Sequence, residues 1–521
     1  WPYGDASLSL QNPYWIQNRI NRTSNKKRYM MNASLKWQAA DWLNVVGRVN
    51  LDNSDYRNKN EKSASTLTTF CGVSGGFEDA MRQERSLYAD FLANIDKTFG
   101  DFHLTANVGA SIYHTSMDQL YIAGDLVIPN FFQINNINFS ANYKPDPTGY
   151  EDEIQSIFAS AELSWKNQLY LTVTGRNDWD SKLAFSKQKS FFYPSVGLSA
   201  LLSEMVKLPE VISYAKIRGS YTVVASSFDR FLTNPGYEYN SQTHNWANPT
   251  VYPMDNMKPE KTKSWEIGLN LKFWGNRFNL DATYYRSNTL NQTFKVDIPS
   301  SSGYKQAIVQ AGNVQNQGLE LALGFNDKWA GFGWSSNATF TLNRNKVKRL
   351  ASGSVNPVTG EAIQMDEMNV GWLGKENVAP RVILTEGGSM TDIYVYNQLT
   401  KDNNGNIKVD QNGNLGITSS NTPVKVGNLD ADFNLGWTNH FTYKGIDLGV
   451  VLSARVGGLA YSATQGILDY YGVSGTSATA RDNGGIPINN GKVNAQKYYQ
   501  TIGTGEGGYG RYYLYSATNV R

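Results

Sequence analysis

The chain has 521 residues, more than one soluble core normally holds, so it forms either several domains or one large closed sheet. Only 18% of the residues are charged while 13% are aromatic, and Tyr and Gly are abundant, which favours β-structure. The net charge of +3 gives no reason to expect a nucleic acid or an acidic partner. The one cysteine, Cys71, excludes an internal disulfide and a cysteine-based zinc site.

No apolar run approaches the roughly 20 residues of a membrane-spanning helix, so a location in a membrane would require a β-barrel. The mean hydropathy of -0.45 is compatible with a barrel, because only every second residue of its strands meets lipid. The start of the chain, Trp1-Pro2-Tyr3, carries no signal peptide, which would indicate a cytosolic protein if the chain were complete.

We expect residues 1–27 to be irregular. Strands are then predicted in pairs. The pairs are 28–38 with 42–56, 84–99 with 102–117, 154–165 with 169–180, 191–202 with 213–225, 262–274 with 277–291, 316–327 with 332–345, and 432–443 with 446–457. A last partial strand is expected to start near Arg511.

The clearest pair lies within residues 258–325, where apolar and polar side chains alternate on both sides of a turn at Gly275-Asn276. Trp265, Ile267 and Leu269 share one face with residues of the return strand such as Phe278 and Leu280. About ten residues of such a pattern suit either a tilted strand in a bilayer or a soluble sandwich with one wet face.

The connections between the predicted strands alternate between short and long. The short ones lie near 38–41, 100–101, 166–168, 275–276, 328–331 and 444–445, with a longer one near 204–211. The long ones lie near 57–83, 118–153, 226–261, 292–315, 346–431 and 458–510; the link 181–190 is the one short member of that set. Short periplasmic turns and long extracellular loops are typical of an outer-membrane barrel.

Aromatic side chains gather beside the short turns. They are Trp37, Trp42, Phe99, Phe102, Trp165, Trp274, Trp329, Trp334 and Tyr443. Such a girdle is typical of a membrane interface and favours the barrel over the sandwich. The sequence therefore predicts an all-β fold, a transmembrane antiparallel up-and-down barrel. The fifteen strands counted are an odd number, so we expect the chain to be incomplete at both ends.

Several motifs resemble the SusC/RagA-type TonB-dependent transporters. Residues 258–269 (KPEKTKSWEIGL) resemble the family's K-P-E-x-T-x-x-x-E-x-G-L hairpin, and residues 300–304 with 311–320 (SSSGY, AGNVQNQGLE) resemble its continuation. Further similar stretches are 171–178 (LTVTGRND), 192–203 (FYPSVGLSALLS), 214–221 (YAKIRGSY), 386–388 (EGG), 454–465 and 480–485 (ARDNGG). The chain departs from the family at Val223-Val224-Ala225-Ser226, where Gly-Asn is usual.

The resemblance implies that residues 1–521 are part of a roughly 22-stranded barrel in the outer membrane of a Gram-negative bacterium. It also implies a SusD-like surface lipoprotein as a lid, and the TonB-ExbB-ExbD machinery acting through a plug domain that this sequence lacks. The remaining implied partners are outer-membrane lipid and an oligomeric glycan or peptide as substrate. Transporter–lid pairs of this type often form dimers.

The residues give no sign of enzymatic chemistry. His103, His114, His244 and His440 have no metal-ligand spacing, so no metal and no cofactor is expected. Asp402 and Asp410 begin two Asn-Gly turns, which we prefer to a calcium loop because Ile407 stands where an EF-type loop needs Gly.

Substrate contacts are predicted for aromatic side chains in the long loops, where they would stack on sugar rings or pack against peptide. These candidates are Tyr237, Trp246, Tyr252, Trp372, Tyr470 and Tyr471, with Tyr239 and Tyr394 beside them. The polar strand face also carries four carboxylates, which are expected simply because that face meets water and which are secondary candidates for a role in selectivity. They are Glu266, Asp281, Glu320 and Asp447.

The favoured hypothesis is TonB-dependent import of oligosaccharides or oligopeptides across the outer membrane. A passive large-bore channel and an adhesin or enzyme acting through the long loops remain as alternatives, as does a soluble array of β-sandwiches.

Overall fold

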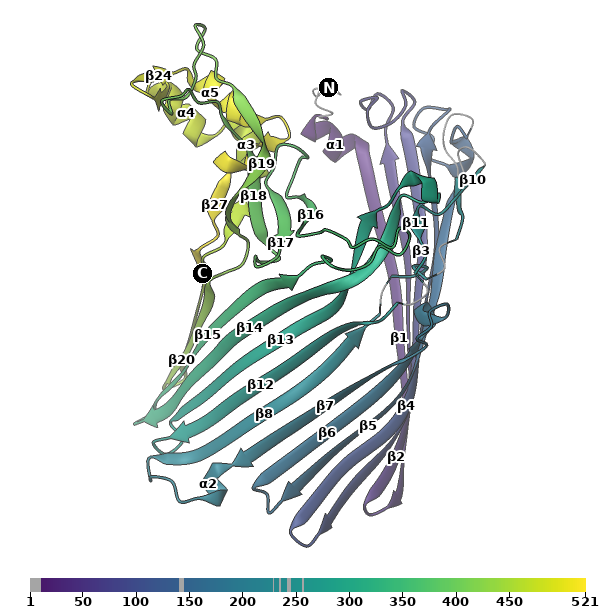
Figure 1. Cartoon of the computed structure of the whole chain (residues 1–521), viewed down its shortest axis with the longest axis vertical. Helices are drawn as coiled ribbons and strands as arrows, with labels where there is room; N and C mark the ends of the chain where they lie inside the picture. The colour runs from purple at the N-terminus through teal and green to yellow at the C-terminus, as the bar shows by residue number, and fades with distance from the viewer. Residues whose placement is uncertain (1–10, 140–144, 228, 234–235, 241–244, 255–256) are drawn as a thin grey trace. The chain divides into compact units, whose positions relative to one another are not determined.

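The computed structural model describes residues 11–139, 145–227, 229–233, 236–240, 245–254 and 257–521 (Figure 1). Long antiparallel strands dominate it. They are β1 (Ile20–Ala40), β2 (Leu43–Lys62), β3 (Gly76–Phe99), β4 (Phe102–Asp125), β5 (Asp146–Trp165), β6 (Leu169–Asp180), β7 (Phe191–Leu201), β8 (Ile212–Ser226), β12 (Glu260–Phe273), β13 (Phe278–Asp297), β14 (Gln306–Trp329), β15 (Phe332–Arg349), β20 (Phe433–Tyr443) and β21 (Ile446–Val456).

These strands lie in the sheet in chain order, and short β28 (Asn519–Val520) follows β21 as the fifteenth. The short strand β11 (Val251–Tyr252) pairs with β14 off this path. The antiparallel up-and-down order predicted from the sequence is therefore confirmed for the described residues, and the fourteen strands predicted in pairs all lie in this sheet.

The chain forms two compact units. The first comprises the described parts of Trp1–Val196, Val223–Glu260 and Lys295–Ile308, and the second comprises Gly197–Thr222, Lys261–Phe294 and Val309–Arg521.

Within the described residues, no helix is both long and apolar enough to cross a membrane.

The predicted strand bounds hold best where one face is apolar. Strand β6 spans the predicted residues 169–180, and β7 differs by one residue. Other strands run further toward the long loops: β3 begins at Gly76 rather than 84, and β14 at Gln306 rather than 316. The β3 extension mixes polar and apolar residues on both faces, and the β14 extension has buried apolar residues on both faces, such as Ile308 and Val309. The alternation of an apolar with a polar face that reveals a strand is therefore absent from both extensions.

Three sequence-based expectations need correction. Residues 1–27 are not irregular throughout: residues 1–10 lie outside the described part, but α1 (Pro13–Arg19) leads into β1 at Ile20, and the polar start of β1 pairs with the polar end of β2. The strand expected near Arg511 is not part of the large sheet: the strand that begins there is the short β27 (Leu514–Ser516), which pairs with β22 (Leu459–Tyr461). The segment 346–431 is not a plain loop, because it contains a four-stranded sheet.

The described loops hold the remaining elements. They are β9 (Glu238–Asn240), β10 (Asn245–Ala247), β16 (Glu367–Trp372), β17 (Arg381–Thr385), β18 (Asp392–Leu399), β19 (Ile417–Asn428), β22 (Leu459–Tyr461), β23 (Ile486–Ile488), β24 (Gly491–Val493), β25 (Gly503–Thr504), β26 (Gly507–Gly508), β27 (Leu514–Ser516), α2 (Leu202–Met205), α3 (Ala463–Tyr470), α4 (Gly475–Asp482) and α5 (Ala495–Ile502). Strands β16 to β19 form the four-stranded sheet.

The segments 350–431 and 457–518 pack together into what we call the loop lobe. Its core contains six buried side chains: Leu399, Leu415, Ile488, Val493, Ile502 and Tyr513. The backbone amide of Leu399 also donates to the hydroxyl of Tyr512 at 2.7 Å. Two connections far apart in the sequence thus share one hydrophobic core, which gives them a fixed structure.

Aromatic rings at the short turns of β12 to β15 contact one another. Phe273 stacks on Phe278 at 5.4 Å between ring centroids, and Phe325 lies 4.8 Å from Phe278 and 4.8 Å from Trp334. Phe325, which the turn-flanking pattern did not single out, thus links rings of three strands into one aromatic cluster.

We predict that Leu399→Ala destabilises the loop lobe by about 2–5 kcal/mol, because the substitution leaves a cavity in its core. Limited proteolysis should then cleave within the lobe at lower protease concentration. Val473→Ala is the matched control, since the Val473 side chain is 69% exposed. Equal cleavage of both variants would contradict a shared core.

Candidate functional site

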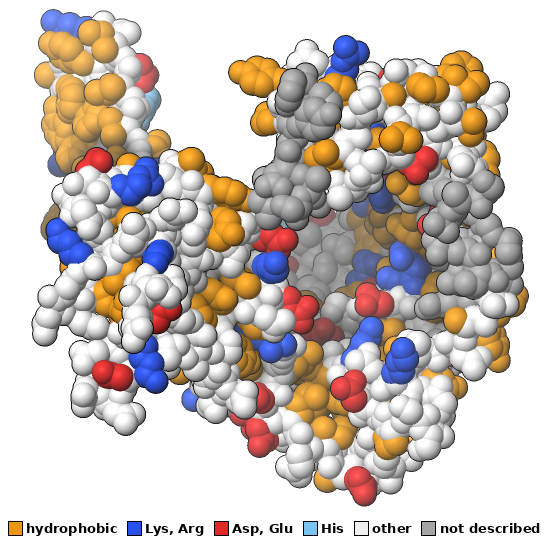
Figure 2. Space-filling view, turned by 90° about the horizontal axis from the view of Figure 1, so that it is seen from above, with side chains coloured by type: hydrophobic (Ala, Val, Ile, Leu, Met, Phe, Trp, Pro, Cys, Tyr) orange, Lys and Arg blue, Asp and Glu red, His pale blue; other side chains and the backbone are white. Residues whose placement is uncertain are grey.

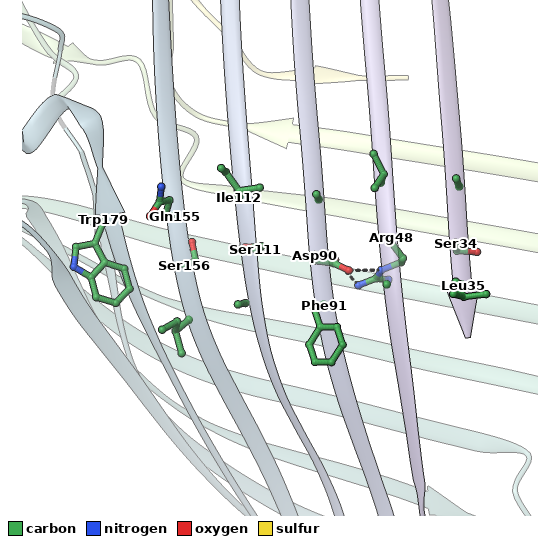
Figure 3. A pocket seen from close by; sticks show the side chains of 16 residues that line it. Ser34, Leu35, Arg48, Asp90, Phe91, Ser111, Ile112, Gln155, Ser156 and Trp179 are labelled. Carbon is green, nitrogen blue, oxygen red and sulfur yellow. Dashed lines mark hydrogen bonds and ion pairs between the residues drawn. The ribbon is translucent and has the colours of Figure 1, made fainter. Parts of the chain in front are cut away.

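The polar face of the first unit carries arginine–carboxylate pairs that join neighbouring strands. Arg28 of β1 donates from Nε to Asp52 Oδ1 of β2 at 2.8 Å. Arg48 of β2 donates in the same way to Asp90 of β3, with distances of 2.9 and 2.7 Å, as the dashed lines in Figure 3 show. Two-point pairing fixes the orientation of each guanidinium and makes this wall polar and rigid.

Tyrosines lie on the same polar face. Tyr88 of β3 and Tyr113 of β4 are opposite each other, with ring centroids 6.5 Å apart. Lys26 of β1 places its ammonium group 4.7 Å from the ring of Tyr56. The face therefore offers rings as well as charges to a polar solute.

In the second unit the polar face is organised by Arg218 of β8. Its guanidinium donates to Asn270, to Asp281 Oδ1 at 3.0 Å and to Thr283 Oγ1 at 2.6 Å. Gly268 makes room for this group, because a Cβ atom there would lie 2.5 Å from Arg218 Nε.

Further along this face the side chains are mostly neutral amides. Asn316 Oδ1 accepts hydrogen bonds from Asn343 at 3.1 Å and from Asn345 at 2.9 Å. Amides present donors and acceptors without net charge, so this part of the face is suited to neutral hydrogen-bonding groups.

The four carboxylates predicted on the polar face are found there by strand register. Glu266 is opposite Tyr285, Asp281 opposite Asn270, Glu320 opposite Thr341 and Asp447 opposite Thr442. Asp281 is held by Arg218, and Asp447 pairs with His440. These two carboxylates therefore have structural partners, which the sequence did not reveal.

The aromatic side chains in the loops of the first unit differ in their exposure to solvent. Tyr237 and Trp246 are the more exposed at 67% and 68%, and Trp246 contacts Tyr239 across the β9–β10 hairpin at 5.1 Å between ring centroids. Tyr252 is half-buried and packs edge-on against Tyr304 at 5.3 Å.

In the second unit, Trp372 belongs to a stack that the sequence did not predict. The guanidinium of Arg381 lies 4.7 Å from the centre of the Trp372 ring and 5.9 Å from that of Tyr396. These residues come from β16, β17 and β18, neighbouring strands inside what the sequence presented as a loop. Tyr394 of β18 instead lies within hydrogen-bonding distance of Thr385, at 3.4 Å.

Tyr470 and Tyr471 end α3 and contact each other edge to face at 5.1 Å. Tyr471 is 41% exposed and Tyr470 is half-buried. Nearby Tyr513 is buried, and desolvation together with the charge of Asp469 raises the pKa of its hydroxyl above the usual range. Tyr513 therefore stays neutral and acts as a core residue.

The Glu386-Gly387-Gly388 motif anchors the loop lobe to β15. The Glu386 carboxylate accepts from the backbone amide of Leu350 at 2.9 Å, and Gly387 N–H donates to the carbonyl of Val347 at 2.7 Å. Val347 N–H in turn donates to the carbonyl of Gly388 at 2.8 Å. The motif therefore has a structural role that a sequence match alone does not reveal.

The two Asn-Gly turns are built as predicted, each around one carboxylate. Asp402 accepts from the backbone amides of Asn404 and Asn406 at 2.8 and 2.9 Å, and Asp410 accepts in the same way from Asn412 and Asn414, both at 2.8 Å. These carboxylates are occupied by their own turns. Among the described residues, no group of three or more His, Cys, Asp or Glu side chains could hold a metal ion.

The described histidines have separate surroundings. His103 lies 2.9 Å from Thr98 Oγ1, His114 lies 3.7 Å from Glu153, and His440 pairs with Asp447. His244 lies outside the described residues.

On the face that Figure 2 shows, basic and acidic side chains of the described residues are intermingled.

Long antiparallel strands with one apolar and one polar face, a girdle of rings at the short turns and structured long loops define a protein of the outer-membrane β-barrel class. Comparison with known protein families assigns the chain to one family within this class. Residues 2–379 match the model of the family described as TonB dependent receptor-like, beta-barrel, and the chain belongs to this family. Proteins of this family are receptors and transporters rather than enzymes, and the chain is an outer-membrane protein.

Curated relatives agree with this assignment. The chain is 24% identical over 426 residues to TonB-dependent receptor P3 of Formosa agariphila, covering 76% of the chain and 41% of that protein. It is 26% identical over 355 residues to TonB-dependent receptor SusC of Bacteroides thetaiotaomicron, covering 62% of the chain and 34% of that protein. The chain thus spans less than half the length of these relatives.

Solved structures show the same fold. One structure of the RagAB peptide transporter superposes with a TM-score of 0.74 at 16% identity, covering 98% of this chain and 56% of that one. The RagAB peptide importer in its open-open state gives a TM-score of 0.71 at 15% identity, covering 98% and 55%. The predicted resemblance to SusC/RagA-type proteins is confirmed.

We predict that Gly268→Ala destabilises the protein by about 1–3 kcal/mol, because the new methyl group displaces the Arg218 guanidinium from Asn270, Asp281 and Thr283. Urea unfolding in lipid vesicles would measure this free energy. In an Arg218→Ala background the same substitution should cost less than about 0.5 kcal/mol, since the displaced group is gone. Equal costs in both backgrounds would show that the contact is unimportant.

We further predict that the turn at Asp410 loosens in acid. The backbone and side-chain amides of Asn414 donate to its carboxylate and hold its pKa below the usual range. Such a lowered pKa stabilises the turn fully above the ordinary value of about 3.9, and the stabilisation is lost as the pH falls through the lowered pKa. Hydrogen-exchange protection at Asn412 and Asn414 should therefore be constant from about pH 7 to 5 and drop below about pH 4.

Asp410→Ala serves as the reference for the unprotected turn and should show low protection at every pH. Protection in the native chain that persists unchanged well below pH 3 would contradict the role given to the carboxylate.

Proposed function

We propose that the protein imports oligosaccharides or oligopeptides across the outer membrane, using energy delivered through TonB and a SusD-like surface lipoprotein as a lid. In this proposal residues 1–521 form part of the barrel, and the segments near 57–83, 118–153, 226–261, 292–315, 346–431 and 458–510 belong to its extracellular side.

The observation that carries the proposal is the hydrophilic face that the long strands present in each of the two units. It combines paired arginines, tyrosine rings and neutral amides in place of the apolar packing of a soluble core. In a barrel of this family, such a face lines the path of a polar solute. A large hydrated oligomer can exchange its bonds to water for bonds to these groups.

The structured loop lobe supports capture of a large substrate rather than passage of small ions. The Trp372–Arg381–Tyr396 stack of the loop lobe presents rings of the kind that bind sugar faces or peptide groups, and so does exposed Trp246 of the β9–β10 hairpin in the first unit. Peptide transport by the RagAB proteins supports a peptide as substrate, and the relative named SusC supports the wider transporter type.

The experiment that tests the proposal uses the full-length protein with its natural partner in cells. We expect uptake of a labelled pool of oligosaccharides or peptides that stops when the proton-motive force is collapsed. Trp246→Ala and Trp372→Ala should each raise the half-saturating concentration by about threefold to tenfold. Trp329→Ala, at a short turn and 42% exposed, is the matched control and should leave it unchanged.

Uptake that continues without the proton-motive force, together with ion conductance of the purified protein in planar bilayers, would contradict the proposal and favour a passive channel. Mass spectrometry of the mildly purified complex then separates the two substrate classes by the mass of whatever oligomer is retained.

A further inference from the structure

The apolar face of the first six strands contains a broad depression in the first unit (Figure 3). Its volume is about 1030 Å³. Small residues form its floor: Ala33, Gly47, Ala89 and Ala110. Large apolar residues surround them: Leu35, Val49, Phe91, Ile112, Ile157 and Trp179.

Strand register explains the depression. Large and small residues alternate across the strands, because Val49 is opposite Ala89 while Gly47 is opposite Phe91. On the next ladder Ala89 is opposite Ile112. A Cβ atom at Gly47 would have no other atom within 4 Å, so the floor is open there. Phe91 and Leu35 are 56% and 76% exposed, so the furrow between such side chains offers apolar surface that a hydrocarbon chain would cover.

This face becomes polar toward the long-loop end of the same strands. Arg85 of β3 lies four residues from Ala89, on the same face and about 13 Å further along the strand. It is opposite Asn53 on β2 and Ser116 on β4. The Arg85 side chain is exposed, and it forms no ion pair with any residue that the structure describes.

The carboxylates on this face near Arg85 do not neutralise it. Asp118 of β4 is opposite Gln83, diagonal to Arg85, and forms no ion pair with Arg85 in the part of the chain that the structure describes. Asp55 accepts hydrogen bonds from Gln83 at 2.8 Å, Asn53 at 3.2 Å and Tyr29 at 3.2 Å. Glu153 accepts from Gln155 and lies beside His114 at 3.7 Å. Glu151 is opposite Ser116, two strands away from Arg85 and therefore about 10 Å to the side.

An apolar furrow with an unpaired cation at its outer end is complementary to an amphiphile that has an anionic head. We propose that this face binds one phosphorylated lipid of the outer leaflet, with an acyl chain in the depression and a phosphate group on Arg85. The short turns are periplasmic, so Arg85 lies toward the extracellular side of the depression. A cation near the membrane surface strengthens binding of an anionic lipid about fivefold.

The test uses the full-length protein in a mild detergent and native mass spectrometry with two probes, purified lipid A and its dephosphorylated form. The native protein should bind lipid A more tightly than the dephosphorylated lipid. Arg85→Gln and Arg85→Glu should each weaken lipid A binding by at least about fivefold and leave binding of the dephosphorylated lipid unchanged. Ala89→Phe, which fills the furrow, should weaken binding of both probes.

Arg82→Gln is the matched control, because Arg82 is on the same strand but on the opposite face, where it pairs with Glu84. It should bind both lipids as the native protein does. Heat-dependent electrophoretic mobility shows that each variant is folded, and Arg85→Lys should retain the preference for lipid A. Equal binding of the two probes by the native protein, or unchanged lipid A binding in folded Arg85→Gln, would overturn the proposal.

Discussion

The structure depends on the need to pair every backbone N–H and C=O group of a strand that crosses lipid. In hydrocarbon an unpaired peptide group costs several kcal/mol, so the strands must be long, adjacent and continuous in their ladders. Ladders such as that of β3 with β4, from Gly76 opposite Asp125 to Phe99 opposite Phe102, satisfy this need. Because side chains alternate along each strand, the same ladders separate an apolar face from a polar one.

Both proposals follow from that separation. On the polar face, side chains that cannot meet lipid pair with one another, as Arg48 does with Asp90 and Arg218 with Asp281. On the apolar face, small residues such as Gly47 and Ala89 alternate with the large residues Phe91 and Val49, and this alternation produces the depression. One strand, β3, therefore contributes Asp90 to the hydrophilic face and Phe91 to the lipid-facing one.

The sequence predicted the strands well wherever one face is apolar. It predicted the bounds of β6 and the ladder of β12 with β13, whose register runs from Lys261 opposite Leu290 to Phe273 opposite Phe278. Beyond the apolar band the outer part of β1 is exposed on both faces, so the pattern that identifies a strand is lost there, and this part of β1 was taken as irregular. The loop lobe was missed because its core joins residues about 100 positions apart, such as Leu399 and Tyr513.

The candidate site was predicted only in part, for a related reason. Exposed rings such as Trp246 can be proposed from composition and loop position. The Arg381 stack cannot, because it needs the register of β16, β17 and β18 to bring Trp372 and Tyr396 to the same guanidinium. Likewise Gly268 matters through Arg218, a contact between two strands that no local pattern encodes.

The most direct test of this account is a spin-label scan along β3 in lipid vesicles, from position 87 to position 95. A variant without Cys71 provides the background, and each site receives one cysteine. Collisions with oxygen dissolved in lipid should be frequent at positions 87, 89, 91, 93 and 95, while collisions with a water-soluble nickel reagent should be frequent at positions 88, 90, 92 and 94. The same accessibility at odd and even positions would contradict the assignment of the two faces.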